Sequence, residues 1–117
     1  MTAQEAVPGF KLPALTASTI ILIGLGGVGS QIALALARKG AGELTLLDHD
    51  IVEPSNLPRQ VYYPKDVGKP KAYALAANLA REGFLDQTFS GYYLSFEDAV
   101  ARGIDLSGSL AIVGVDK

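Results

Sequence analysis

Residues 19–29 read TIILIGLGGVG, and this segment decides the fold. Its first five residues, 19–23, are mostly branched and apolar, which is typical of a strand buried on both faces of a parallel sheet. The glycines that follow turn the chain. Residues 30–39 then place apolar side chains at helical spacing until Gly40 ends the pattern. The segment therefore predicts a strand, a glycine turn and a helix in succession.

The rest of the chain continues this alternation. Further strands are predicted over 43–47, over 88–94, where Gly91 interrupts the pattern, and over 110–115. Strands that alternate with helices predict an α/β fold, here a Rossmann-like three-layer αβα arrangement with a mostly parallel sheet. We expect this domain to span residues 19–117, after an N-terminal extension over 1–18.

Two more helices and one long loop are predicted between these strands. Pro70 suits the first turn of a helix over 71–81, and Ser95 with Asp98 resembles a capping box that opens a short helix. Residues 51–69 contain three prolines, which prevent a regular element across most of that segment. A loop of this length inside a compact domain is usually functional.

Composition excludes several classes of function. The chain has 117 residues, a formal net charge of −2 and no cysteine. It therefore offers no basic field for nucleic acid, no disulfide and no thiolate ligand. Neither a secretory signal nor an apolar run long enough to span a bilayer is apparent, so we expect a cytoplasmic protein without membrane or nucleic-acid partners.

The glycine turn indicates nucleotide binding. Gly24 permits a tight turn, Gly26 lets the backbone approach phosphate oxygens, and Gly29 allows the helix to pack closely on the strand. The positive end of the helix dipole then faces an anion. Asp48 follows about 20 residues later, at the end of the second strand, where it can accept hydrogen bonds from ribose hydroxyls. The alternative to nucleotide binding is that these glycines only allow the helix to pack on the strand.

Three polar residues end the second strand. Asp48 and Asp50 are expected on one side of the extended chain and His49 on the other, so a paired-carboxylate metal site is one interpretation. The alternative interpretation, in which Asp50 only orders the loop by accepting a hydrogen bond, is almost equally favoured. We expect His49 to be structural, since a single histidine without partners forms neither a metal site nor an acid-base pair.

Cations around the long loop favour a triphosphate over a dinucleotide. Arg59 can bind phosphate oxygens as a fork, and Lys71 can bind them as a point charge. The alternative is that both are ordinary charges on a solvated surface.

Taken together, the motifs resemble one superfamily, that of HesA, MoeB and ThiF, which includes ubiquitin-activating enzymes and the adenylyltransferases of thiamin and molybdopterin biosynthesis. The resemblance rests on GLGGVGS at 24–30, LDHD at 47–50, SNLPRQ at 55–60, GKPK at 68–71 and GVD at 114–116, which occur in order across nearly the whole chain.

The resemblance implies ATP-dependent adenylation of a partner's C-terminal glycine carboxylate, with ATP and Mg²⁺ as cofactors. The partner would be a ubiquitin-like or sulfur-carrier protein. It implies Arg59, Lys71 and Asp116 as catalytic residues, with Asp116 also binding the metal ion. The nucleotide-binding residues it implies are Gly24, Gly26, Gly27, Gly29, Asp48, Asp50, Asn56, Arg59, Gln60 and Lys71.

The chain also departs from the superfamily. Members are commonly longer, and the later part often carries a catalytic or zinc-binding cysteine, so we expect an N-terminal fragment of a longer adenylyltransferase. The alternatives are a natural short form completed by a partner and a nucleotide-binding remnant without turnover. A homodimer or a companion subunit is expected. Lys117 follows Asp116 where asparagine is usual, and Pro58 replaces a polar residue. The competing functions are an NAD-binding oxidoreductase domain, which leaves Asn56, Arg59 and Lys71 without a role, and a non-catalytic nucleotide-binding or interaction subunit of the same fold.

Overall fold

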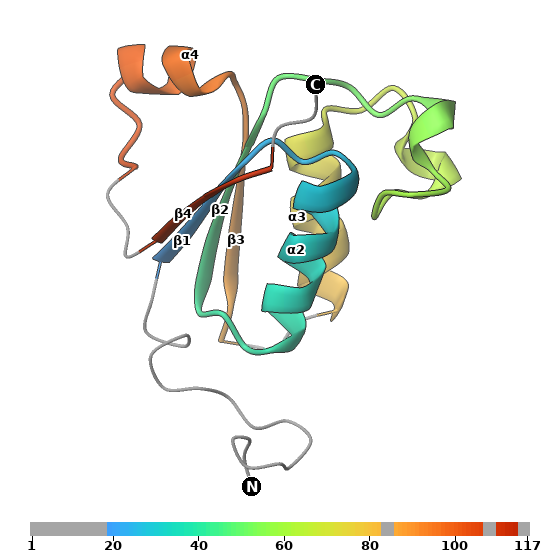
Figure 1. Ribbon diagram of the computed structural model, residues 1–117, viewed down its shortest axis with the longest axis horizontal. Coiled ribbons are helices and arrows are strands. Elements are labelled where there is room, and N and C mark those ends of the chain that lie inside the picture. The colour runs from blue at the N-terminus through green and yellow to red at the C-terminus, as the bar shows by residue number, and fades with distance from the viewer. Residues whose placement is uncertain (1–18, 83–85, 107–109, 115–117) are drawn as a thin grey trace, which may run out of the picture.

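The computed structural model describes residues 19–82, 86–106 and 110–114 (Figure 1). The final sequence motif therefore lies partly outside the described residues, and Asp116 with it. The described strands are β1 (Thr19–Ile23), β2 (Glu43–Asp48), β3 (Thr88–Tyr93) and β4 (Leu110–Val113). The described α-helices are α2 (Gly27–Arg38), α3 (Lys71–Glu82) and α4 (Phe96–Ala101).

The four strands form one sheet in the order β3-β2-β1-β4, and every pair is parallel. At the centre, Leu22 of β1 lies opposite Leu46 of β2 on one side and Ile112 of β4 on the other. The first two crossovers, through α2 and α3, each move the chain one strand outward. The third, through α4, carries it from β3 across to the far side of β1. The predicted Rossmann-like parallel sheet is thus confirmed.

Alternate side chains of the central strands enter two separate cores, as the two-residue period of a strand requires. Ile20 and Leu22 pack with buried residues of α2 and α3, whereas Ile21 packs with Ala99 of α4 and with Ile104 beyond it. In Figure 1, α2 and α3 lie together beside the sheet, and α4 lies apart from them. This confirms the predicted three-layer arrangement, with a small third layer. The longest described helices have 12 residues, and none is long and apolar enough to cross a bilayer.

Two predictions about glycines need correction. Helix α2 begins at Gly27 and not at Ser30, so the last glycines of the turn already belong to its first turn. Strand β3 runs without interruption through Gly91. A Cβ atom at Gly91 would lie 2.8 Å from the carbonyl carbon of Ala72 and closer still to its oxygen. The glycine lets α3 pack directly on β3, and it does not break the strand.

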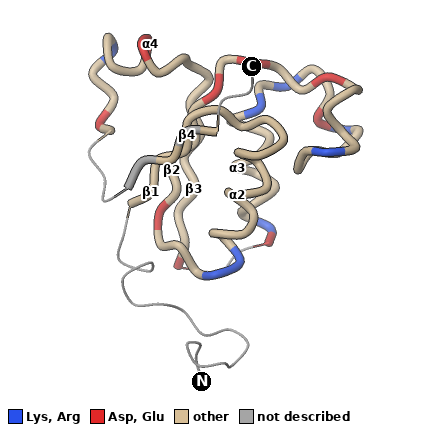
Figure 2. The backbone as a smooth tube through the Cα atoms, viewed as in Figure 1, with Lys and Arg blue, Asp and Glu red and all other residues tan. Residues whose placement is uncertain are grey.

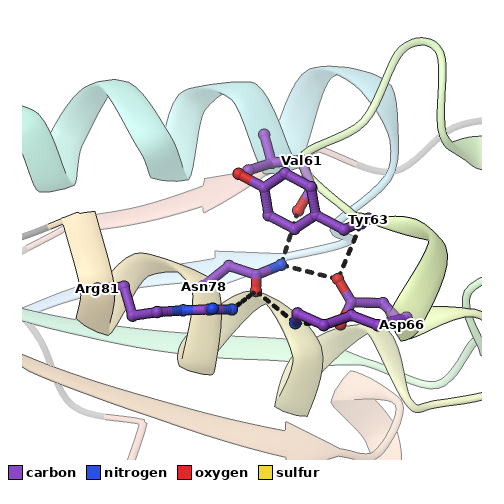
Figure 3. A network of polar contacts seen from close by, with 6 residues as sticks. Val61, Tyr63, Asp66, Asn78 and Arg81 are labelled. Atoms are coloured by element: carbon purple, nitrogen blue, oxygen red, sulfur yellow. Dashed lines mark hydrogen bonds and ion pairs between the residues drawn. The ribbon is translucent and has the colours of Figure 1, made fainter.

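The long loop is ordered by a buried polar network (Figure 3). It contains the short 3₁₀ turns η1 (Pro54–Asn56) and η2 (Pro64–Asp66). The Asp66 side chain is 1% exposed and accepts hydrogen bonds from the Asn78 amide at 2.9 Å, the Tyr63 N–H at 2.9 Å and Lys65 at 3.0 Å. Asn78 also donates to the Val61 carbonyl at 3.3 Å. These contacts fasten the loop to α3.

Burial raises the pKa of Asp66, but its hydrogen bonds from Asn78, Tyr63 and Lys65, together with the Lys65 charge, outweigh burial. The resulting pKa lies below the ordinary value of an aspartate. The folded chain therefore holds this carboxylate in its ionised form.

Candidate functional site

A pocket of about 420 Å³ opens at the carboxyl ends of the strands. It lies where α2 and α3 leave the sheet on one face while α4 covers the other, which is where ligands of open α/β sheets bind. Its size falls within the range of small-molecule sites. Its lining comes from the end of β1 with the glycine turn (Ile23, Gly24, Leu25, Gly26), the end of β2 (Leu47, Asp48, His49, Asp50), Lys71, the start of α4 (Ser95, Phe96, Glu97) and Gly114.

The glycine turn forms one wall of the pocket. Gly24 has φ of 91°, a left-handed conformation that favours glycine, and its N–H donates to the Leu47 carbonyl at 2.9 Å. Gly29 lies against Gly24 and is buried under the turn, as the packing role predicts. Within the described chain, the N–H groups of Gly26, Gly27 and Val28 have no hydrogen-bond partner, because they precede the first closed turn of α2. Such a cluster of free donors suits an anion.

Asp48 is 8% exposed and lines the pocket beside this turn. One carboxylate oxygen accepts from the Leu25 N–H at 2.6 Å, and the other accepts from the Asp50 N–H at 2.6 Å. Each oxygen has a second lone pair, so the carboxylate can still accept from hydroxyl groups of a ligand. Asp48 thus joins the end of β2 to the glycine turn as well as facing the pocket.

Lys71 provides a positive charge in the pocket. Its N–H donates to the Asp50 carbonyl at 3.0 Å, and the residue is 7% exposed, so most of its side chain is covered. No carboxylate in the part of the chain that the structure describes lies within ion-pair distance of its ammonium group. A lysine can cover its stem while its charged head stays accessible, so a Lys71 ammonium on the pocket wall is available to an anion there. Figure 2 shows that basic and acidic residues are interspersed along the rest of the backbone.

Asp50 and His49 lie at the open side of the pocket. Both are exposed, and His49 Nε2 lies 3.8 Å from Asp50 Oδ1. A ligand atom from each of Asp48, His49 and Asp50 can be chosen so that all lie within 4.8 Å of one another. The predicted opposite orientation of His49 is therefore not seen, because the chain leaves strand geometry after Asp48. Nothing further marks these exposed groups as a metal site.

Three predicted residues of the long loop lie outside the pocket lining. The Asn56 side chain accepts from the Glu53 N–H at 2.7 Å and so caps η1. Arg59 is exposed, and its carbonyl oxygen lies 4.0 Å from the position a Cβ would take on Gly27. The Gln60 amide oxygen is buried without a partner in the described chain. The structure thus places Arg59 beside the start of α2, and leaves all three roles as predictions.

The start of α4 is a part of the pocket that sequence reasoning missed. The Ser95 side chain accepts from the Asp98 N–H at 3.1 Å, which confirms the predicted helix cap. Ser95, Phe96 and Glu97 also line the pocket, and Phe96 is 43% exposed there. A signal was available, since this segment follows β3 and the carboxyl ends of parallel strands share one edge of the sheet.

These features define a Rossmann-like α/β domain with a glycine turn at the switch point of its sheet. Residues 4–82 match the ThiF family. The chain belongs to this family, as the sequence motifs predicted.

Relatives share the sequence over the same region. The chain is 46% identical over 68 residues to the mouse adenylyltransferase and sulfurtransferase MOCS3, covering 57% of this chain and 15% of that protein. It is 47% identical over 64 residues to the SAMP-activating enzyme E1 of Haloferax volcanii, covering 54% of this chain and 24% of that protein. The chain therefore spans less than a quarter of the length of these curated relatives.

Solved structures share the fold. E. coli MccB crystallised with ATP superposes with a TM-score of 0.77 at 29% identity, over 87% of this chain and 30% of MccB. E. coli tRNA N6-threonylcarbamoyladenosine dehydratase, TcdA, also gives 0.77, at 32% identity, over 88% of this chain and 44% of TcdA. The described fold is thus one portion of larger proteins, one of which was crystallised with ATP.

Proposed function

We propose that this chain binds ATP with Mg²⁺ and serves in the adenylation of the C-terminal glycine carboxylate of a ubiquitin-like or sulfur-carrier protein. The observation that carries the proposal is Lys71, a covered cation on the pocket wall with no carboxylate partner in the described chain. It faces the same pocket as the glycine turn, whose free N–H groups supply further donors for phosphate oxygens.

The residues fit a nucleotide in three ways. Asp48 keeps acceptor capacity for ribose hydroxyls, and the glycine turn with Lys71 offers donors for phosphates. Phe96 offers an aromatic surface for the base at the third wall. We propose Asn56, Arg59 and Gln60 as phosphate-side residues on the resemblance, together with Asp50 at the pocket mouth.

In the proposed reaction, a carboxylate oxygen of the partner forms a bond to the α-phosphorus of ATP. The bond from that phosphorus to the bridging oxygen breaks, and pyrophosphate leaves with the electron pair. The nucleophile is already ionised, so the chain needs no base. Its own residues would contribute by holding the reacting groups in place and by neutralising charge.

Mg²⁺ would neutralise phosphate charge, and Asp116, outside the described residues, is the residue we propose to hold it. The chain covers only part of its relatives. For that reason we propose that a second copy or a companion subunit contributes to the full reaction.

The first experiment is calorimetric titration of the full chain with ATP and Mg²⁺, and separately with NAD. Lys71→Met removes the charge and keeps much of the apolar stem. Losing one charge-assisted contact is expected to raise the ATP dissociation constant by roughly tenfold or more. Lys69→Met is the matched control, because Lys69 is exposed and does not line the pocket.

Adenylation itself is measured by ATP–pyrophosphate exchange that depends on a partner with a free C-terminal carboxylate. Binding of NAD in place of ATP would overturn the proposal and favour an oxidoreductase domain. Equal ATP affinity in wild type and Lys71→Met would overturn the role of Lys71.

A further inference from the structure

We infer that Tyr62 is a positioning residue, which aims the Gly26 N–H into the pocket by holding the Leu25 carbonyl from behind. The inference rests on the proposed function, because the aimed donor is one that would meet the nucleotide phosphates. Tyr62 lies in the long loop, is 4% exposed and is not part of the pocket lining. No sequence motif drew attention to it.

The hydroxyl of Tyr62 donates to the Leu25 carbonyl oxygen at 2.7 Å, and both groups are buried. The Leu25 carbonyl and the Gly26 N–H belong to one planar peptide unit. In a trans peptide these two groups point in opposite directions, so a carbonyl held toward Tyr62 directs the Gly26 N–H away from Tyr62. Gly26 lines the pocket, and its N–H has no partner in the described chain.

The turn is fixed from its other side as well. The Leu25 N–H donates to Asp48 at 2.6 Å, so the two peptide units that meet at Leu25 are each held by a side chain. Glycines on both sides of Leu25 leave this backbone intrinsically free to rotate, which makes such anchors necessary. Tyr62 holds the unit that carries the free donor, and Asp48 holds the unit before it.

Tyr62 is itself held firmly by its neighbours in sequence. The Val61 N–H donates to the Ser30 hydroxyl of α2 at 3.2 Å, and the Val61 carbonyl accepts from Asn78 of α3 at 3.3 Å. Burial raises the pKa of the Tyr62 hydroxyl, and the charges of Asp48 and Asp66 raise it further, so the hydroxyl stays protonated as the donor. The hydrogen bond from Tyr62 to Leu25 therefore links the glycine turn to a loop segment that is itself bonded to α2 and α3.

The test uses Tyr62→Phe in the full chain, which removes the hydroxyl alone. Tyr73→Phe is the matched control, since Tyr73 is exposed and its hydroxyl has no partner in the described chain. A second control, Ile20→Val, removes one buried methyl group at the start of β1, outside the pocket lining and without altering the contacts of Tyr62. Thermal unfolding of each variant separates loss of stability from loss of positioning.

In the nucleotide-free chain, Tyr62→Phe is expected to shift the Gly26 amide resonance more than that of Leu25, whose N–H is held by Asp48. Calorimetry is expected to show an ATP dissociation constant raised about tenfold, as for one lost charge-assisted donor. Tyr73→Phe should match wild type in both measurements. Ile20→Val should lower the unfolding temperature and leave the ATP dissociation constant within about twofold.

An unchanged Gly26 resonance, or an unchanged ATP dissociation constant in Tyr62→Phe, would overturn the inference while the proposed function stands. An equal rise in the dissociation constant for Ile20→Val would also overturn it, because lost stability alone would then explain the effect. If the wild-type chain binds no ATP, the proposed function fails, and the amide measurements still decide whether Tyr62 orients the Gly26 peptide.

Discussion

Replacing Gly29 by alanine should destabilise the fold strongly, whereas the same change at Gly27 should not. A Cβ atom at Gly29 would lie 3.0 Å from the Gly24 carbonyl carbon and closer still to its oxygen. Both contacts are to backbone, and no side chain can rotate away to relieve them. At Gly27 the nearest atom to such a Cβ is the Arg59 carbonyl oxygen at 4.0 Å, an ordinary contact.

The expected magnitude follows from these contacts. Overpacking of a tight site typically costs about 1–3 kcal/mol. Gly29→Ala belongs at the upper end or beyond, because α2 must move away from the backbone of the turn that Gly24 forms. Gly27→Ala gains helix propensity of up to about 1 kcal/mol and loses little packing. The two variants should therefore differ by roughly 3 kcal/mol or more.

Urea unfolding, followed by circular dichroism, measures this difference. An unchanged slope with a lower midpoint would show that stability, and not the unfolded state, has changed. A small domain has only about 5–15 kcal/mol of stability in total, so the shift should be plain, and failure of Gly29→Ala to fold would agree with the argument. A Gly29→Ala chain within about 0.5 kcal/mol of wild type would refute the close packing of α2 on the turn.

Two further outcomes are expected. Because the pKa of Asp66 is lowered in the folded chain, its contribution to stability should be present above the ordinary aspartate pKa of about 4 and lost as the pH falls through the folded-state value. Urea unfolding of Asp66→Asn should show a loss of about 1–3 kcal/mol at pH 7 that shrinks toward pH 3, and a loss independent of pH would contradict this. Phe96→Ala should raise the ATP dissociation constant by roughly tenfold in calorimetry, as for one lost stacking contact, whereas Val100→Ala on the same helix, exposed and outside the pocket, should leave it unchanged.

Much of the fold could be predicted because its signals are local. The run at 19–23, the glycines after it and the helical spacing that follows all act within a few residues, and the structure confirms β1, the turn and α2. Repetition of that unit was enough to predict a parallel sheet. The same local signals misplaced the start of α2. They also predicted a strand interrupted at Gly91, because the close approach between α3 and β3 depends on residues that are distant in sequence.

The site could be predicted only in part, for the same reason. Asp48, Asp50, Lys71 and the glycine turn follow strands or begin helices, and the structure brings them to one pocket. The hydroxyl of Tyr62 meets a carbonyl 37 residues earlier, and Phe96 reaches the pocket through a crossover behind the sheet. The Tyr62 contact has no sequence pattern, because it depends on how whole elements pack, and the only signal for Phe96 is its place after β3.

The placement of hydrogen-bond partners separates the structural from the functional polar groups of this chain. Around Asp66 and Asn78, each buried side-chain donor and acceptor has a partner, and the result is a fastened loop. Around the glycine turn the Leu25 and Gly26 carbonyls each accept a hydrogen bond, yet the Gly26 N–H and the Lys71 ammonium have no partner in the described chain. Donors left without an acceptor in this way are available to a ligand, and the neighbouring fully paired network orders the loop beside them. An anion of several oxygens satisfies a backbone N–H and a lysine together, so it is the class of ligand that these unpaired donors favour.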